Sequence, residues 1–182
     1  MKKGMKTRTI KMKKTDTAYS LFQECKKLFP AWCWDEKELK NITNDRNGKY
    51  EIKFKDCVEA DEELKNTSAN ELKEKGIIGI TLPERLKMEL DFFKETGKHL
   101  DVENITLCSG SRLSDGFVPF VYWFVGGLRV HYFSPGIANG RLRSRQAVSS
   151  TSNLKSFNLD SFDLSQIKIT IRGKNYGLVE EV

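Results

Sequence analysis

The chain has few of the residues from which metal sites and catalytic sites are built. Its 182 residues include two histidines, and its four cysteines are irregularly spaced without a C-x-x-C pair. A zinc site on paired cysteines is therefore not expected, and no spacing supports a Ser/His/Asp or Cys/His catalytic set. We expect no enzymatic activity, no metal and no cofactor. Without an export signal, the thiols are expected to be reduced.

Long apolar runs are also missing. The longest runs are far too short to span a bilayer, and no apolar stretch follows the basic N-terminal residues as it would in a secretory signal. We therefore expect a cytoplasmic protein without a membrane span.

The second half of the chain lacks residues that usually cover a solvated surface. No Lys occurs between Lys98 and Lys155, no Glu occurs between Glu103 and Glu180, and no Met follows Met88. Soluble proteins ordinarily place Lys and Glu on any solvated face. This segment is therefore buried, or exposed for a purpose, or subject to another constraint on its residue types.

The remaining composition is that of a soluble globular protein. Charged residues make up 31% of the chain and hydrophobic residues 38%, which suits one domain. The formal charge is +6, and much of the excess lies in the first residues, MKKGMKTRTIKMKK. We expect a basic flexible N-terminus at residues 1–14, a single domain at residues 15–150, and a C-terminal tail or last strand at residues 151–182. The basic segment is either a frayed chain end or an arm for nucleic acid.

Three segments have the apolar spacing and capping residues of amphipathic helices: residues 15–29, 67–75 and 81–96. The first is expected to begin at Thr15 or Asp16. The AWCW sequence that follows brings Trp32 and Trp34, and we expect both to pack in the core or between elements. Residues 50–54 alternate as an edge strand does.

From residue 105 the pattern changes to a period of two, with many Gly residues between the runs. ITLC, VPFVYWF, LRVHYF and RLRSRQAVS are predicted strands, and the Gly pair at 126–127 is expected to close a hairpin. The predicted fold class is α+β: N-terminal helices followed by a small twisted antiparallel sheet.

Alternation divides the hairpin side chains of residues 118–133 into two sets. One set is aliphatic with Trp123 and is expected to face the core. The other set carries aromatic rings together with Arg129 and His131, and it has the composition of a contact surface. The alternative is that both faces are buried, with the aromatic rings packed under a helix.

The residue types missing from residues 110–145 have a common property at the level of codons. Lys, Glu, Gln, Met and Trp cannot be encoded by codons that end in T or C, and all five are absent except for Trp123. Trp123 belongs to the set expected in the core. The residues of the other set are all reachable from an Asn codon by changing its adenines.

Residues 108–149 (CSGSRLSDGFVPFVYWFVGGLRVHYFSPGIANGRLRSRQAVS) resemble the variable region of target proteins of diversity-generating retroelements. In that family a reverse transcriptase copies a template repeat into the gene with adenine-specific errors. The diversified residues lie on a C-type lectin fold, often of the formylglycine-generating-enzyme type, and form a ligand-binding face. The resemblance covers roughly residues 75–150. Residues 151–182 depart from it, because many such proteins end at the variable region.

The resemblance implies a C-type lectin-like domain whose diversified positions bind the ligand. The Cys pair of formylglycine-generating enzymes is not visible, so their oxidase activity is not carried over. The diversified, ligand-binding positions would be Phe117, Phe120, Tyr122, Phe124, Val125, Arg129, His131, Phe133, Ser134, Gly136, Ile137, Ala138, Asn139, Gly140 and Arg141.

The expected function is therefore a ligand-binding scaffold whose hypervariable surface recognises a protein or another macromolecule. The alternative is a nucleic-acid-binding protein that uses the basic N-terminus and the cluster Arg141, Arg143 and Arg145. A structural role for that cluster is favoured, with a scaffold carboxylate such as Asp115 as the partner.

Overall fold

The computed structural model describes residues 6–148, 168–171 and 174–177. The chain divides into two compact units, Met1–Ser149 and Ser150–Val182. The second unit contributes an antiparallel pair, β10 (Lys168–Ile171) and β11 (Lys174–Gly177). The rest of the expected C-terminal tail lies outside the described residues. No helix in the described parts of the chain combines the length and the apolar character needed to cross a bilayer.

The first unit alternates short strands and helices. Its elements are β1 (Thr7–Met12), α1 (Ala18–Leu28), β2 (Ala31–Cys33), the 3₁₀ turn η1 (Glu38–Lys40), β3 (Thr43–Asn44), β4 (Tyr50–Lys55), the 3₁₀ turn η2 (Glu62–Leu64), α2 (Ala69–Glu74), α3 (Leu82–Thr96), β5 (Ile105–Leu107), β6 (Ser111–Arg112), β7 (Val118–Phe124), β8 (Gly127–Phe133) and β9 (Leu142–Arg143).

The α+β class is confirmed, but the arrangement of the sheets differs from the prediction. The largest sheet has five strands in the order β2-β8-β7-β5-β9, and β1-β4 and β3-β6 form separate pairs. β2 runs parallel to β8 and β9 runs parallel to β5, so this sheet is mixed rather than antiparallel. Strands also precede α1 and separate it from α2, because each pairs with a strand far along the chain.

The N-terminal segment also differs from the expectation that it is flexible. Thr7–Met12 is not a flexible end but forms β1, which pairs with β4 in antiparallel register. Ile10 is fully buried and Met12 nearly so, because their side chains lie against the main core. Arg8 forms ion pairs with Asp56 and Glu95. The alternation of basic and apolar residues in this segment is therefore that of a strand with one buried face.

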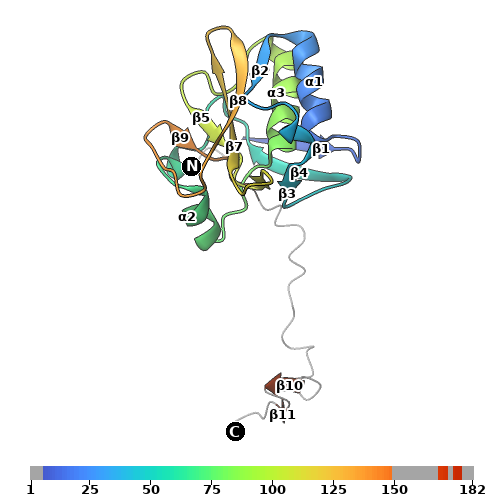
Figure 1. The fold of residues 1–182 in the computed structure, drawn as a ribbon, viewed down its shortest axis with the longest axis vertical. Coiled ribbons are helices and arrows are strands. Elements are labelled where there is room, and N and C mark those ends of the chain that lie inside the picture. Colours follow the sequence, from blue (N-terminus) through green and yellow to red (C-terminus); the bar gives the residue numbers. More distant parts are fainter. Residues whose placement is uncertain (1–5, 149–167, 172–173, 178–182) are drawn as a thin grey trace. The chain divides into compact units, whose positions relative to one another are not determined.

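The helices follow from local sequence signals. α2 begins with the expected capping box at Ser68, and α3 begins with the expected N-cap Thr81, which also forms a capping box; α3 ends at Gly97 with a φ of 68°. The N-cap of α1 is Thr17 rather than the expected Thr15 or Asp16, because the Thr17 hydroxyl accepts a hydrogen bond from the Ser20 backbone N–H. Figure 1 shows α1 and α3 side by side against one face of the main sheet.

The hairpin of β7 and β8 positions the two sets of side chains as alternation predicts. Val121 lies opposite Val130 and Trp123 lies opposite Leu128. The aliphatic members of these pairs belong to the buried cluster formed with α1 and α3. The turn residues Val125 and Gly126 both have positive φ, as in a type I′ turn.

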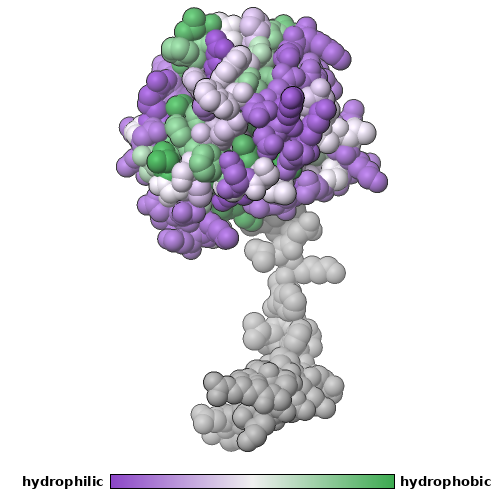
Figure 2. Space-filling model, in the orientation of Figure 1, coloured by the Kyte–Doolittle hydropathy of each residue, from purple (hydrophilic) through white to green (hydrophobic). Residues whose placement is uncertain are grey.

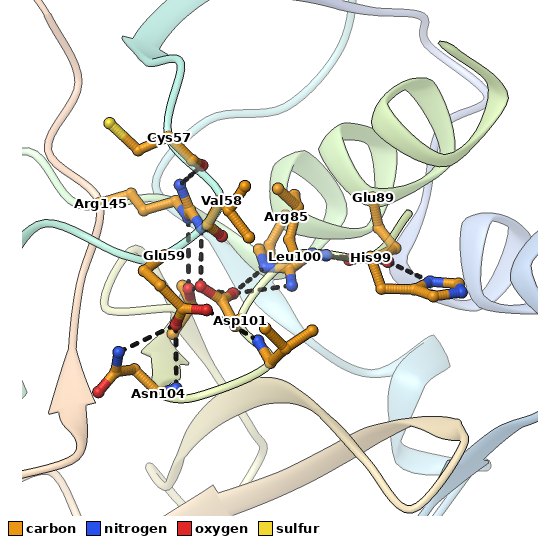
Figure 3. Close-up of polar contacts among 12 residues, drawn as sticks. Cys57, Val58, Glu59, Arg85, Glu89, His99, Leu100, Asp101, Asn104 and Arg145 are labelled. Carbon is orange, nitrogen blue, oxygen red and sulfur yellow. Dashed lines mark hydrogen bonds and ion pairs between the residues drawn. The ribbon is translucent and has the colours of Figure 1, made fainter. Parts of the chain in front are cut away.

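A fully buried ionic cluster joins the parts of the first unit that are far apart in the sequence (Figure 3). Asp101 accepts hydrogen bonds from Arg85 of α3 at 2.8 Å, from Arg145 at 2.7 Å and from the hydroxyl of Thr106 at 2.5 Å. Burial opposes ionisation of Asp101, but the charges of Arg145 and Arg85 and the Thr106 hydrogen bond outweigh it. The pKa of Asp101 is therefore below its usual range.

Arg145 extends this cluster to the segment after β4. Its guanidinium donates to the backbone carbonyls of Cys57 and Val58 at 2.9 and 2.8 Å, in addition to Asp101. The side chain is 1% exposed. Asp101 itself has a φ of 52°, a left-handed conformation that is uncommon for residues other than Gly. The cluster thus fixes both the backbone of the loop before β5 and the end of the region that resembles a variable region.

We predict that Asp101→Asn lowers the free energy of unfolding by about 3–5 kcal/mol, because two buried arginines lose their carboxylate partner. Urea unfolding followed by circular dichroism measures the change. The control is Glu51→Gln, which breaks the exposed pair with Lys11 and should change the free energy by less than about 1 kcal/mol.

Wild type and Asp101→Asn can also be compared in acid. A lowered folded-state pKa means that Asp101 stabilises the protein above its unfolded pKa, about 3.9, and that this contribution is lost as pH falls through the folded pKa. The difference between wild type and Asp101→Asn should therefore shrink below about pH 4. A difference that is small at neutral pH, or one that grows in acid, would contradict this account of the cluster.

Candidate ligand-binding face

The register of β7 and β8 gathers the second set of hairpin side chains on one side of the main sheet. Phe120 lies opposite His131, and Tyr122 lies opposite Arg129. Tyr122 and Phe124 continue along β7, with ring centroids 6.2 Å apart. These side chains form a continuous surface on the side away from α1 and α3.

Trp32 of β2 and Trp34, which directly follows β2, add to this surface, which corrects the expectation that they pack in the core or between elements. Trp32 lies opposite Arg129 in the parallel pair of β2 and β8, and the Trp34 ring centroid is 4.9 Å from that of His131. Trp32 is 42% exposed and Trp34 is 62% exposed. The signal in the sequence was their spacing of two residues, which puts both on one face of a short strand.

We call the set Trp32, Trp34, Phe120, Tyr122, Phe124, Arg129, His131 and Phe133 the aromatic face. Its rings contact one another across three strands, with ring centroids 5.8 Å apart for Trp32 and His131 and 4.2 Å apart for Phe120 and Phe133. Figure 2 shows hydrophobic side chains gathered over β5, β7 and β9, whereas the surface over α1 is mostly hydrophilic.

The aromatic face is covered at one end and open at the other. Phe120, expected to be an exposed anchor, is buried, because it packs with Leu72 of α2 and Leu142 of β9. Phe124, four residues along β7, is 51% exposed. The alternative of a sheet buried on both faces therefore holds for the start of the hairpin and fails near its turn.

A hollow of about 220 Å³ lies beside the open end of the face. Ile105, Phe120, Tyr122, Phe124, Phe133 and Arg141 line it. The Arg141 guanidinium donates to the backbone carbonyl of Glu103 at 3.1 Å. The hollow is thus apolar at its walls and has one cation at its rim.

The loop of residues 134–141 borders the same region. Its backbone is fixed at both ends, since the Pro135 carbonyl accepts from Asn70 of α2 and the Asn139 side chain accepts from the backbone of Arg141 and Leu142. The predicted binding positions between these contacts are solvent-exposed: Ser134, Gly136, Ile137, Ala138 and Gly140.

Phe117 and Val125 lie farther from the centre of the surface. They flank β7 at its two ends, so about 25 Å of strand separates them at roughly 3.3 Å per residue. A small molecule could not contact both residues at once. The fifteen predicted positions therefore have the extent of a macromolecular contact, and all of them except Phe120 are at least partly exposed.

Val125 has a conformation that its side chain disfavours. Its φ is 47°, and it is 77% exposed at the tip of the hairpin. A β-branched residue at positive φ is a backbone outlier, whereas Asn followed by Gly is a preferred sequence for this turn. No contact of Val125 in the described structure accounts for this residue choice.

The aliphatic side chains of the hairpin strands, expected to face the core, are buried together with Leu142 of β9. Val118, Val121, Leu128, Val130 and Leu142 are at most 1% exposed. Burial alternates only in part of the hairpin. Residues 118–121 of β7 are all buried and the strand becomes exposed toward the turn, whereas in β8 the buried Leu128 and Val130 alternate with half-buried Arg129 and His131.

The structural role favoured for the arginine cluster holds for Arg143 and Arg145, but not with the expected partner. Arg143 and Arg145 are 6% and 1% exposed, so they cannot present a surface to phosphates. Arg143 pairs with Glu62, and Arg145 with Asp101. Asp115, the expected partner, instead accepts from the backbone N–H of Phe117.

The strand predicted to carry these arginines is shorter in the structure, where it corresponds to β9. The chain leaves β9 to bond with the segment before α3, where Gly79 forms an isolated bridge with Gln146. The backbone N–H of Ile80 donates to the Arg145 carbonyl, and that of Ala147 donates to the Ile78 carbonyl.

Comparison of the chain with models of protein families, with curated proteins and with solved structures gives no match.

We predict that truncating Phe120 and truncating Phe124, both on β7, have unequal effects on the free energy of unfolding. Phe120→Ala should lower the free energy of unfolding by about 3 kcal/mol, because it leaves a cavity between β7, α2 and β9. Phe124→Ala should change it by less than about 0.5 kcal/mol, because that ring is exposed. Denaturant unfolding of both variants measures the difference. Equal losses would mean that the face is buried along its whole length.

A second prediction concerns the hairpin turn. Val125→Asn should raise the free energy of unfolding by about 1 kcal/mol, because Asn tolerates positive φ far better than a β-branched residue. Val58→Asn is the control, since Val58 is also exposed but its φ is not positive. A destabilised Val125→Asn protein would contradict the interpretation that Val125 is strained.

Proposed function

We propose that this chain is a ligand-binding scaffold that displays a diversified surface, the target protein of a diversity-generating retroelement with a C-type lectin-like domain. The surface comprises the predicted positions of β7, β8 and the loop of residues 134–141, and it recognises a protein or another macromolecule. The chain acts by binding, without a catalytic step.

The observation that carries the proposal is the agreement between the positions assigned to the diversified set and the exposure of their side chains. On β7 and β8, the positions assigned to the diversified set have side chains that are exposed or half-buried, Phe120 excepted. The aliphatic residues between them are buried, and Trp123, which codons ending in T or C cannot encode, packs against the core. A mutational process confined to those positions would alter the surface and leave the core intact.

Val125 supports the same proposal. An adenine-directed process acts on an Asn codon, and Asn at this position would form the Asn-Gly turn that the hairpin geometry favours. Val is one of the residues that the process can produce from an Asn codon, and Val at this position strains the turn. Selection for the fold alone would not favour Val at this position, whereas a mutational process that acts irrespective of the fold can place Val there.

The alternative function in nucleic-acid binding loses most of its support. Two of the three clustered arginines are buried, as described above. Lys6, Arg8 and Lys11 of the basic N-terminal segment form ion pairs with Asp56, Glu95 and Glu51. Binding driven by phosphate contacts needs several cations that are free to release counterions.

A library of the chain tests the proposal. The predicted positions other than Phe120 are replaced by codons NNY, in which the third base is T or C, and the fraction of folded variants is measured by protease resistance on yeast. We expect most variants to fold, because the changes are confined to exposed and half-buried side chains.

The control library makes an equal number of NNY replacements at buried positions, among them Val118, Val121, Leu128, Val130 and Leu142. We expect nearly all of these variants to be cleaved, because each buried replacement by a polar or smaller residue costs about 2–5 kcal/mol. Similar folded fractions in the two libraries would refute the division between scaffold and diversified surface.

A further inference from the structure

Two exposed tryptophans of the aromatic face lie outside the region that resembles a variable region. We propose that Trp32 and Trp34 form a constant anchor beside the diversified positions, and that the combined surface binds an acidic, apolar segment of a partner protein. This inference rests on the proposed function, because it takes the diversified positions to be part of the contact.

The surroundings of the two tryptophans are those of a contact rather than of a core. The indoles pack edge to face with ring centroids 6.1 Å apart, and each is within 5.8 Å of the His131 ring. Both remain well exposed despite these contacts. Exposed neighbouring tryptophans leave a large apolar area in water, and Trp is among the residues most enriched in binding hot spots.

The charges near the aromatic face indicate which partner it fits. The Arg129 guanidinium lies 6.0 Å from the Trp32 ring centroid, and the Arg141 guanidinium bonds only a backbone carbonyl in the described structure. Glu36, a carboxylate close to Trp34 in the sequence, already pairs with Lys26 and Gln23. Two guanidiniums are thus available, and they pair preferentially with carboxylates.

The hollow beside Tyr122 and Phe124 indicates where the apolar part of the partner lies. An apolar side chain inserted there would contact Ile105 and Phe133, and a neighbouring carboxylate of the same segment would reach Arg141 at the rim. A second carboxylate would meet Arg129 beside Trp32. The face therefore fits a segment in which acidic residues alternate with large apolar residues.

With Trp32 and Trp34 as a constant anchor, part of the contact surface is the same in every copy of the chain. Variation at His131 or Arg129 would change the side chains that touch Trp34 and Trp32, but it would leave Trp32 in place on β2 and Trp34 directly after it. Sister copies of the chain would then share an affinity for apolar segments and differ in the neighbouring contacts that set specificity.

The test selects peptides of about twelve residues from a random phage library on the immobilised full-length chain, and measures the affinity of the synthesised peptides by fluorescence anisotropy. We expect selected peptides rich in Asp, Glu and large apolar residues. The Trp32→Ala/Trp34→Ala double variant should bind them at least about tenfold more weakly, as for the loss of hot-spot side chains. Arg129→Gln should weaken binding and flatten its dependence on salt.

The matched control is Ile78→Ala, because Ile78 is 53% exposed but lines a different hollow, with Arg46 and Lys73. It should bind the peptides within about twofold of wild type. Thermal melts of every variant separate loss of the surface from loss of the fold.

Three results would overturn the inference: selected peptides that are basic, binding that survives the double Trp variant, or an absence of enriched peptides. A preference for single-stranded oligothymidine over every peptide would also overturn it. Peptides whose binding is lost in Tyr122→Ala but kept in the double Trp variant would leave the proposed function standing and refute only this inference. Failure of the NNY library described above would refute the proposed function itself.

Discussion

The first unit of this chain depends on one buried carboxylate. Asp101 is fully inaccessible to solvent and binds two arginines, one from α3 and one from the end of the region that follows β9. Through Arg145 it also holds the two carbonyls after β4. A buried charge without its partners is strongly destabilising, so the cluster forms only when all of these segments are in place. The loop before β5 and the segment that follows β9 are thereby fixed independently of the side chains on the aromatic face.

This separation explains how a surface could vary without loss of the fold. The stabilising contacts lie in the ionic cluster, in the caps of α2 and α3, and in the apolar core between the helices and one face of the sheet. Near the hairpin turn, the exposed Phe124 and Val125 lie outside that core, whereas Leu128 belongs to it. Because a strand alternates its side chains between two faces, the same seven residues of β7 can supply both a core and a contact surface. Phe120 marks the limit of that freedom, since α2 and β9 cover it.

The sequence predicts the parts of the fold that depend on local signals. Capping residues identify α2 and α3, and alternation with a Gly turn identifies the hairpin and its two faces, because these patterns involve residues close together in the chain. It does not predict features that depend on distant partners. β1 could not be recognised from its basic sequence, because its formation depends on pairing with β4. The exposure of Trp32 and Trp34 follows from the parallel pairing of β2 with β8. The burial of Phe120 and Arg145 likewise depends on elements remote in the sequence.

The central claim is that the diversified positions of β7, β8 and the loop of residues 134–141 were produced by adenine-directed mutation, and it is tested most directly in DNA. The measurement is to sequence the source genome around this gene and to search for a near-copy of the codons for residues 108–149. The account predicts a copy beside a reverse-transcriptase gene, with differences only where the copy carries adenine, including an Asn codon at the position of Val125. A genome without such a copy, or a copy whose differences fall equally on the codons of buried residues such as Val121 and Val130, would contradict it.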